Sequence, residues 1–290
     1  MKLGVSAFAW TAKFDASHFR LLPEIKEMGF TGFEIAMFDP ADLAITDIRR
    51  AFEASALECT VCAILPAGIN PISPDVATRR KSLQHLIRCI EASAELGANL
   101  LGGPLYAPIG YLPEHRPTED EWCWAVEAFQ SIGEHLDKFQ ITLSIEPVNR
   151  SETFFLRTAR EAKRLCDLVG HARIGVTIDT FHANIEEQNI GEAITSLGSQ
   201  LKHLHASEND RSLLGQGHVD FGTIVAARKR INYDGYLMLE GFGYSPHEAS
   251  GPGVLWADMS VSPEMIARRG AQFLSNLLTE NGYSEPQTTV

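Results

Sequence analysis

Short apolar runs alternate along the chain with longer segments whose apolar residues recur at helical spacing. The runs at 143–145 and 174–178 are mostly apolar and β-branched, as strands buried on both faces of a parallel sheet are. The segment 19–28 has the helical period and stops at Gly29, a residue that often follows a helix end. The pattern therefore predicts repeated strand–helix units.

Eight such units follow one another without a break in composition. The predicted strands are 3–8, 32–37, 58–64, 99–103, 141–146, 174–179, 201–206 and 235–240. The predicted helices are 19–28, 43–55, 74–96, 118–139, 158–169, 190–197, 221–230 and one through 266–277. Each unit takes about 30 to 35 residues, as a strand and its crossover helix require.

Eight alternating units predict a single α/β domain over residues 1–281, folded as a (β/α)₈ TIM barrel. Residues 282–290 read as a flexible C-terminal tail. An open, doubly wound sheet is the alternative. The first strand–helix turn lacks the GxGxxG pattern, which disfavours a dinucleotide-binding version of that sheet.

Charge and composition limit the classes of partner and the cellular compartment that we expect. The net charge is −12, with 25 Lys and Arg against 37 Asp and Glu, so we expect no nucleic-acid partner. No apolar run is long enough to span a membrane, and we expect no membrane association. Five cysteines and no secretory-type segment predict reduced thiols in a cytoplasmic protein. Cys59 and Cys62 lie in a predicted strand and point to opposite faces, so they do not form a zinc site.

Ligand-type side chains mark the ends of four successive predicted strands. They are Glu146, Asp179, His205 and Glu240. The carboxyl ends of the strands meet at one face of such a barrel, where its active sites form. Any one of these residues could be a helix cap or an ion-pair partner. Four such residues at the same position on four successive strands predict a shared site.

Three converging carboxylates need a compensating positive charge. A like-charge pair at 4 Å costs about 4 kcal/mol at an effective dielectric of 20. A divalent ion removes this repulsion, and three oxygen ligands with one nitrogen suit hard to borderline ions. We therefore predict that these four residues bind one metal ion, Mn²⁺ in the first place, with Mg²⁺ and Co²⁺ as alternatives.

More polar residues follow the same strands. Glu152, His182 and Arg211 lie in the loops after the fifth, sixth and seventh strands, where binding groups collect. Their alternative role is in loop ion pairs and caps. His203 lies two residues before His205 and shares its face, which indicates a core or supporting role.

Several sequence strings resemble those of the D-tagatose 3-epimerase family of ketose 3-epimerases, within the xylose isomerase-like barrels. The strings are SIEPVNR, IDTFHANIEE, HLHASENDR, GQGHVDF and MLEGF, between residues 141 and 242. The resemblance implies a homodimer or homotetramer. It also implies that Glu146, Asp179, His205 and Glu240 bind the metal and that Glu152, His182 and Arg211 bind the sugar.

The loop after the fourth strand departs from the family. Its stretch 107–111 lacks the tryptophan that relatives often carry there, so the pocket for the far end of the sugar differs. Candidates for the apolar wall of this pocket are Phe8, Trp10, Cys62, Tyr111 and Phe242, with core packing as the alternative for each.

The implied reaction inverts C3 of a free ketohexose or ketopentose of the D-tagatose, D-fructose, D-psicose and L-ribulose class. Glu146 and Glu240 would remove and return the proton through a metal-held cis-enediolate. The main alternative is an aldose–ketose isomerase on the same scaffold. A phosphosugar enzyme, a barrel nuclease and a sugar-binding protein without catalysis are further alternatives.

Overall fold

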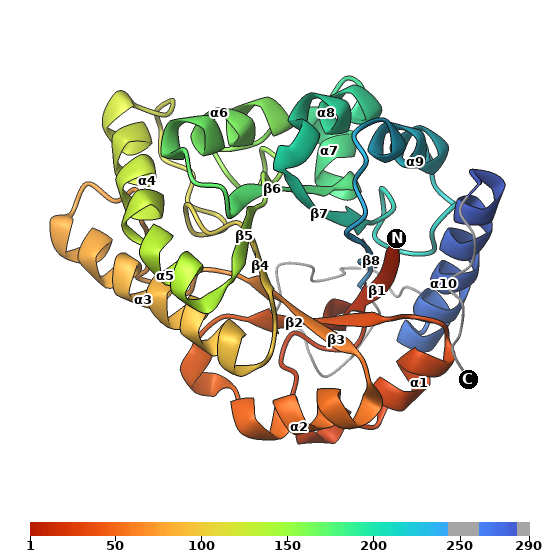
Figure 1. Cartoon of the computed structure of the whole chain (residues 1–290). Coiled ribbons are helices and arrows are strands. Elements are labelled where there is room, and N and C mark those ends of the chain that lie inside the picture. The colour runs from red at the N-terminus through yellow and green to blue at the C-terminus, as the bar shows by residue number, and fades with distance from the viewer. Residues whose placement is uncertain (243–260, 283–290) are drawn as a thin grey trace.

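The computed structural model describes residues 1–242 and 261–282, which form a closed barrel of eight parallel strands in sequence order (Figure 1). The strands are β1 (Lys2–Ser6), β2 (Gly32–Met37), β3 (Glu58–Ala63), β4 (Leu100–Gly103), β5 (Thr142–Ile145), β6 (Ile174–Asp179), β7 (Leu201–Ala206) and β8 (Tyr236–Leu239). Because β8 pairs with β1, the barrel is closed and the open-sheet alternative is wrong.

Helices form a ring outside the barrel (Figure 1). They are α1 (Leu21–Glu27), α2 (Ile45–Ser55), α3 (Val76–Glu95), α4 (Glu119–Ser131), α5 (Gly133–Phe139), α6 (Ala159–Val169), α7 (Thr180–Glu186), α8 (Ile190–Leu197), α9 (Phe221–Arg230) and α10 (Pro263–Glu280). Short 3₁₀ turns are η1 (Ala7–Ala9), η2 (Ala16–His18), η3 (Pro40–Asp42) and η4 (Gly198–Gln200). The apolar faces of the helices pack on the strands and form the main core.

Two helical segments differ from the prediction. The segment expected as one helix over 118–139 is divided into α4 and α5 at Ile132, whose ψ of −3° departs from helical geometry before Gly133. Helix α7 was not predicted. It begins directly after β6 because the side chain of Asp179 accepts a hydrogen bond from the backbone N–H of Phe181 at 2.9 Å.

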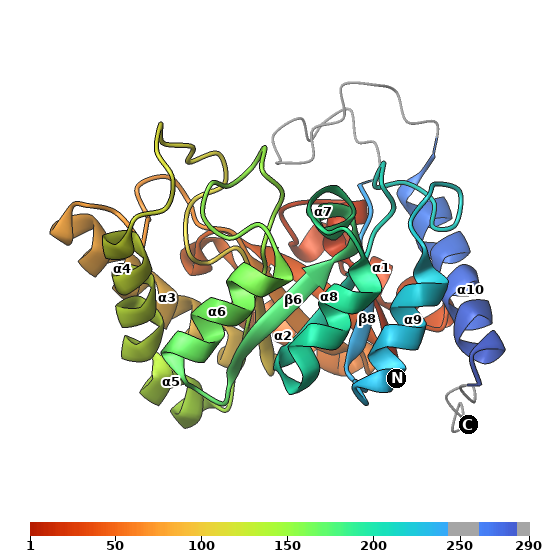
Figure 2. The same cartoon turned by 90° about the horizontal axis from the view of Figure 1, so that it is seen from above.

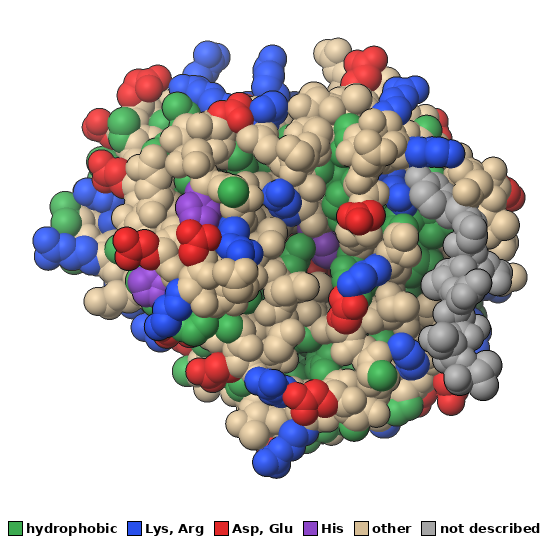
Figure 3. All heavy atoms as spheres, viewed as in Figure 1, with side chains coloured by type: hydrophobic (Ala, Val, Ile, Leu, Met, Phe, Trp, Pro, Cys, Tyr) green, Lys and Arg blue, Asp and Glu red, His purple; other side chains and the backbone are tan. Residues whose placement is uncertain are grey.

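The carboxyl ends of the strands carry α7 and most of the long loops at one end of the barrel (Figure 2). On the face seen in Figure 3, basic and acidic side chains are interspersed, so the net negative charge does not gather into one patch there. No helix in the described part of the chain is long and apolar enough to cross a membrane. Of the predicted tail, residues 283–290 lie outside the described residues.

Gly103 is required at the end of β4. Its φ is +121°, and a Cβ atom there would lie 2.1 Å from the carbonyl oxygen of Ala63. We expect Gly103→Ala to lower the free energy of unfolding by about 3 kcal/mol or more, since backbone strain and a backbone clash add. Gly110→Ala is the matched control, because its φ is +81° but no atom lies within 4 Å of the added Cβ.

Denaturant unfolding measures both variants. Gly110→Ala should lose only about 1 kcal/mol, the strain alone. Equal losses in the two variants would show that the close approach of β4 to β3 is not a constraint.

Candidate metal centre and active site

The four predicted metal ligands lie at the carboxyl ends of four neighbouring strands. Asp179 is the last residue of β6, and His205 is the last but one of β7. Glu146 and Glu240 directly follow β5 and β8. Their backbone N–H groups still donate to the neighbouring strand, to the carbonyls of Gly103 on β4 at 3.1 Å and Ala206 on β7 at 2.9 Å. The barrel backbone therefore fixes the positions of the four Cα atoms that carry these side chains.

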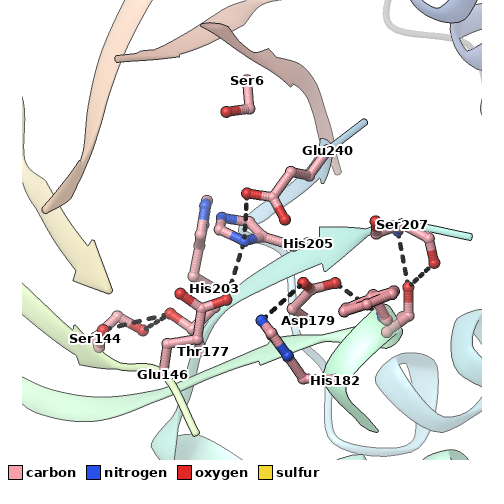
Figure 4. Close-up of polar contacts among 12 residues, drawn as sticks. Ser6, Ser144, Glu146, Thr177, Asp179, His182, His203, His205, Ser207 and Glu240 are labelled. Atoms are coloured by element: carbon pink, nitrogen blue, oxygen red, sulfur yellow. Dashed lines mark hydrogen bonds and ion pairs between the residues drawn. The ribbon is translucent and has the colours of Figure 1, made fainter. Parts of the chain in front are cut away.

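These side chains converge on one nitrogen of His205 (Figure 4). Its Nδ1 lies 3.4 Å from Oε1 of Glu146 and 3.8 Å from Oε1 of Glu240. Ligand atoms of Asp179, His205 and Glu240 all lie within 4.8 Å of one another, and so do those of Glu146, Asp179 and His182. Asp179 joins the two groups, so the four predicted ligands surround one small space.

The carboxylates of Glu146, Asp179 and Glu240 surround this space, and Arg211 and His205 are positively charged or chargeable groups beside them. Burial, together with Glu240 and Glu146, raises the pKa of Asp179 well above its ordinary value, despite Arg211 and His205. Burial alone would lower the pKa of His205, but Glu34, Glu240 and Glu146 raise it. Nδ1 of His205 and Oδ2 of Asp179 are buried without a hydrogen bond. This donor set fits a divalent cation, which would hold the carboxylates ionised.

Arg211 is tied to the same carboxylates. Its guanidinium contacts Oε2 of Glu240 at 2.5 Å and Oδ2 of Asp179 at 3.4 Å. The rings of Phe181 and Phe242 lie 4.0 and 4.6 Å from its guanidinium carbon. Its φ of +57° is uncommon for a residue with a side chain, and such strain is often kept at functional sites.

His182, on α7, is buried beside these groups. Its Nδ1 accepts a hydrogen bond from the backbone N–H of Asn149 at 3.1 Å, and Nδ2 of Asn149 lies 2.9 Å from the same atom. Burial, Arg211 and His205 lower the pKa of His182 well below its ordinary value. The ring is therefore neutral, with its hydrogen on Nε2. That nitrogen lies 3.1 Å from an amino nitrogen of Arg211 and 3.7 Å from Oδ2 of Asp179.

Glu152 completes the polar side of the site. Asn149 donates to its Oε1 at 2.8 Å through Nδ2. Burial raises the pKa of Glu152, with further contributions from Glu146 and Glu240, while Arg211 and Asn149 oppose the rise. The structure thus brings together all seven residues that the sequence singled out.

A pocket lined by Glu146 and Glu240 opens at the strand ends and holds about 410 Å³ of space, including its mouth toward solvent. Its polar side consists of Glu146, Glu152, His182, Arg211 and Glu240. Its apolar side consists of Phe8, Cys62, Ile64, Pro104, Ile109, Val148 and Phe242. This combination of an apolar wall and a few convergent polar groups is typical of small-molecule sites.

Two of the five candidates for the apolar wall lie elsewhere. The indole N–H of Trp10 donates to Glu264 at 3.2 Å, and its ring packs near Phe33. The ring of Tyr111 packs edge-on against Phe154, 5.6 Å between centroids. Ile64, Pro104 and Ile109 take their place in the wall.

Sequence reasoning missed two buried residues at the site. Glu34, in the middle of β2, lies 3.0 Å from Nε2 of both His203 and His205. Burial would raise its pKa, but the charges of the two histidines lower it. Asn149 links His182 to Glu152. A carboxylate inside an otherwise apolar strand was the signal for Glu34. Asn149 lies within the string SIEPVNR, but no role was predicted for it from the sequence.

Comparison with known proteins agrees with this geometry. The profile of the xylose isomerase-like TIM barrel family matches residues 22–277. A probable ketose 3-epimerase from Synechocystis sp. is 30% identical over 283 residues, covering 97% of this chain and 98% of that protein. An L-ribulose 3-epimerase from Mesorhizobium japonicum is 28% identical, with coverage of 94% and 93%.

A solved structure is also similar. The crystal structure of a D-allulose 3-epimerase from Methylomonas sp. matches with a TM-score of 0.89 at 26% identity, covering 96% of this chain and 98% of that one. The chain therefore belongs to the xylose isomerase-like TIM barrel family and, within it, to the ketose 3-epimerases.

Proposed function

We propose that this chain is a metal-dependent ketose 3-epimerase that acts on free ketohexoses or ketopentoses, the class named for its relatives. The proximity of Glu146, Asp179 and Glu240 to His205, whose Nδ1 has no hydrogen bond, at the base of a pocket carries this proposal. A panel of D-tagatose, D-fructose, D-psicose and L-ribulose with added Mn²⁺ tests it. The expected product is the 3-epimer, whereas an aldose would select the isomerase alternative.

The metal would be held by Glu146, Asp179, His205 and Glu240. Three carboxylates and one imidazole favour Mn²⁺, with Mg²⁺ and Co²⁺ as alternatives. When bound, the ion supplies the positive charge that makes the C3 proton acidic and stabilises the enediolate.

Glu146 and Glu240 are the proposed proton-transfer pair. Both side chains line the pocket, and they flank Nδ1 of His205 from strands β5 and β8. One carboxylate takes the C3 proton, and the other returns a proton to the opposite face of the same carbon. The roles exchange in the reverse reaction, which inverts the configuration at C3 in both directions.

Three residues would orient the O1–O3 end of the sugar. Neutral His182 donates from Nε2, Arg211 supplies a fixed positive charge, and Glu152 accepts from hydroxyl groups near O1 and O2. Arg211 is already paired with Glu240 and Asp179, so it is poorly placed to bind a phosphate as well. This pairing favours a free sugar over a phosphosugar.

Asn149 should support this recognition without touching the metal ligands. Asn149→Ala removes the side-chain contacts to His182 and Glu152. Each lost hydrogen bond is worth about 1 kcal/mol, so we expect kcat/KM to fall about 10- to 30-fold, mostly through KM. Steady-state kinetics across the ketose panel measure the effect.

Ser151→Ala in the same loop is the control, because it removes a side chain that makes neither contact. Its kcat/KM should stay within about 2-fold of the unchanged protein. Mn²⁺ affinity should be unaltered in both variants. An unchanged KM in Asn149→Ala would contradict the proposed role of this loop.

We also propose a single domain over residues 1–281, a cytoplasmic location and a homodimer or homotetramer. All five cysteines are free and four are buried, which fits a reducing compartment. The family resemblance supports the oligomer. Light scattering coupled to size-exclusion chromatography tests it, and a monomer would contradict it.

A further inference from the structure

A buried carboxylate and two histidines lie on the inner side of the candidate metal centre. Glu34 has no exposed surface. Its Oε1 lies 3.0 Å from Nε2 of His205, and its Oε2 lies 3.0 Å from Nε2 of His203. The hydroxyl of Thr60 donates to Oε2 at 3.3 Å. Each oxygen of Glu34 therefore faces an imidazole nitrogen.

Among the described residues, the ion pairs of Glu34 are with these two histidines. Oε1 of Glu34 and Nε2 of His205 are buried and make no well-aligned hydrogen bond, although they lie 3.0 Å apart as an ion pair. A buried polar atom without a partner costs free energy, so this ion pair is the interaction that compensates both atoms. Both carboxylate oxygens of Glu34 therefore interact with the two histidine rings.

The contact with Glu34 determines which ring nitrogen of His205 carries the hydrogen. A carboxylate only accepts, so the nitrogen that faces it, Nε2, must be the one that carries the hydrogen. The lone pair of a neutral ring is then on Nδ1. That atom faces Oε1 of Glu146 at 3.4 Å and Oε1 of Glu240 at 3.8 Å.

We infer that Glu34 is the positioning residue of the metal centre, which fixes His205 as the Nε2–H tautomer with Nδ1 directed at the ion. The inference rests on the proposed function, because it takes His205 to be a metal ligand. A carboxylate behind a ligating histidine orients the ring and raises its basicity.

His203 holds Glu34 in this position. It precedes His205 by two residues on β7 and therefore points to the same side of the strand. The two rings meet edge to face, 4.9 Å between centroids. With His203 on Oε2, the carboxylate is held between the rings and cannot turn away from His205.

Metal affinity separates this role from simple core packing. In Glu34→Gln, the amide keeps the shape but presents a donor to one of the two histidines. We expect the Kd for Mn²⁺ to rise about 10- to 100-fold. The measurement is a titration of metal-free protein with Mn²⁺, in which electron paramagnetic resonance reports the free ion and no turnover is needed.

The tautomer provides a second readout. Nitrogen-15 NMR of the Mg²⁺-loaded protein should show the hydrogen of His205 on Nε2. Glu34→Asp keeps the charge but is one methylene shorter, so it cannot reach both rings at 3.0 Å. Its Kd for Mn²⁺ should also rise about 10-fold, which tests the inference even if Glu34→Gln does not fold.

Thr60→Val is the matched control. It removes a contact to the same carboxylate but leaves both histidine contacts, so its Kd should stay within about 3-fold of the unchanged protein. Equal weakening in Thr60→Val and Glu34→Gln would overturn the inference, as would an unchanged Kd in a folded Glu34→Gln. If the unchanged protein itself bound no Mn²⁺, the proposed metal centre would be refuted first.

Discussion

Glu146→Gln and Glu240→Gln should each reduce kcat for 3-epimerisation by about 10³-fold or more. A glutamine retains the shape and one ligand oxygen of the glutamate but cannot accept or return a proton. Positioned acid–base groups contribute about 10²- to 10⁴-fold, and both residues also contribute to the metal site. Steady-state kinetics with the preferred ketose at saturating Mn²⁺ measure the loss.

Two comparisons make this result specific. Glu192→Gln, an exposed residue in the first turn of α8, makes the same chemical change away from the site and should keep activity within about 2-fold. Residual Mn²⁺ binding in both site variants would show that proton transfer, and not only the ion, was lost. A site variant that kept activity within about 10-fold would contradict the assignment of the pair.

Removal of the metal should abolish turnover and lower thermal stability together. Without a cation, the carboxylates of Glu146, Asp179 and Glu240 repel one another around Nδ1 of His205. An ion that binds only the folded state stabilises it by about 4 kcal/mol at 1,000 times its Kd. We expect added Mn²⁺ to raise Tm by about 5 to 15 °C over the metal-free protein.

The test is dialysis against EDTA, followed by activity and thermal unfolding assays with and without Mn²⁺. Activity should return when Mn²⁺ is restored. In Asp179→Asn, the rise in Tm on adding Mn²⁺ should be much smaller, because one charged ligand is gone. Full activity in protein shown to be metal-free would contradict a metal-dependent reaction.

The sequence was sufficient to predict the barrel and the proximity of the four strand-end residues. Each strand ends where an apolar run meets a polar side chain, and in a closed parallel barrel these ends meet at one face. The spacing of one strand–helix unit between Glu146, Asp179, His205 and Glu240 was therefore enough to predict that they lie together. Their distances confirm that proximity.

Features that depend on tertiary contacts could not be read from the sequence. Glu34 lies in the middle of β2, and only the closed barrel brings β2 opposite the histidines of β7. Helix α7 is too short to show a clear period, and its start depends on Asp179 acting as a cap. Trp10 and Tyr111 were plausible for the pocket by position, but their partners Glu264 and Phe154 come from distant parts of the chain.

Hydrogen exchange at C3 tests the central claim most directly. The preferred ketose should be incubated in D₂O with the Mn²⁺-loaded protein, and the 3-epimer isolated early in the reaction. Because one carboxylate removes the C3 proton and the other delivers a different one, the product should carry deuterium at C3. A 3-epimer that retained its original hydrogen there would contradict proton transfer between Glu146 and Glu240.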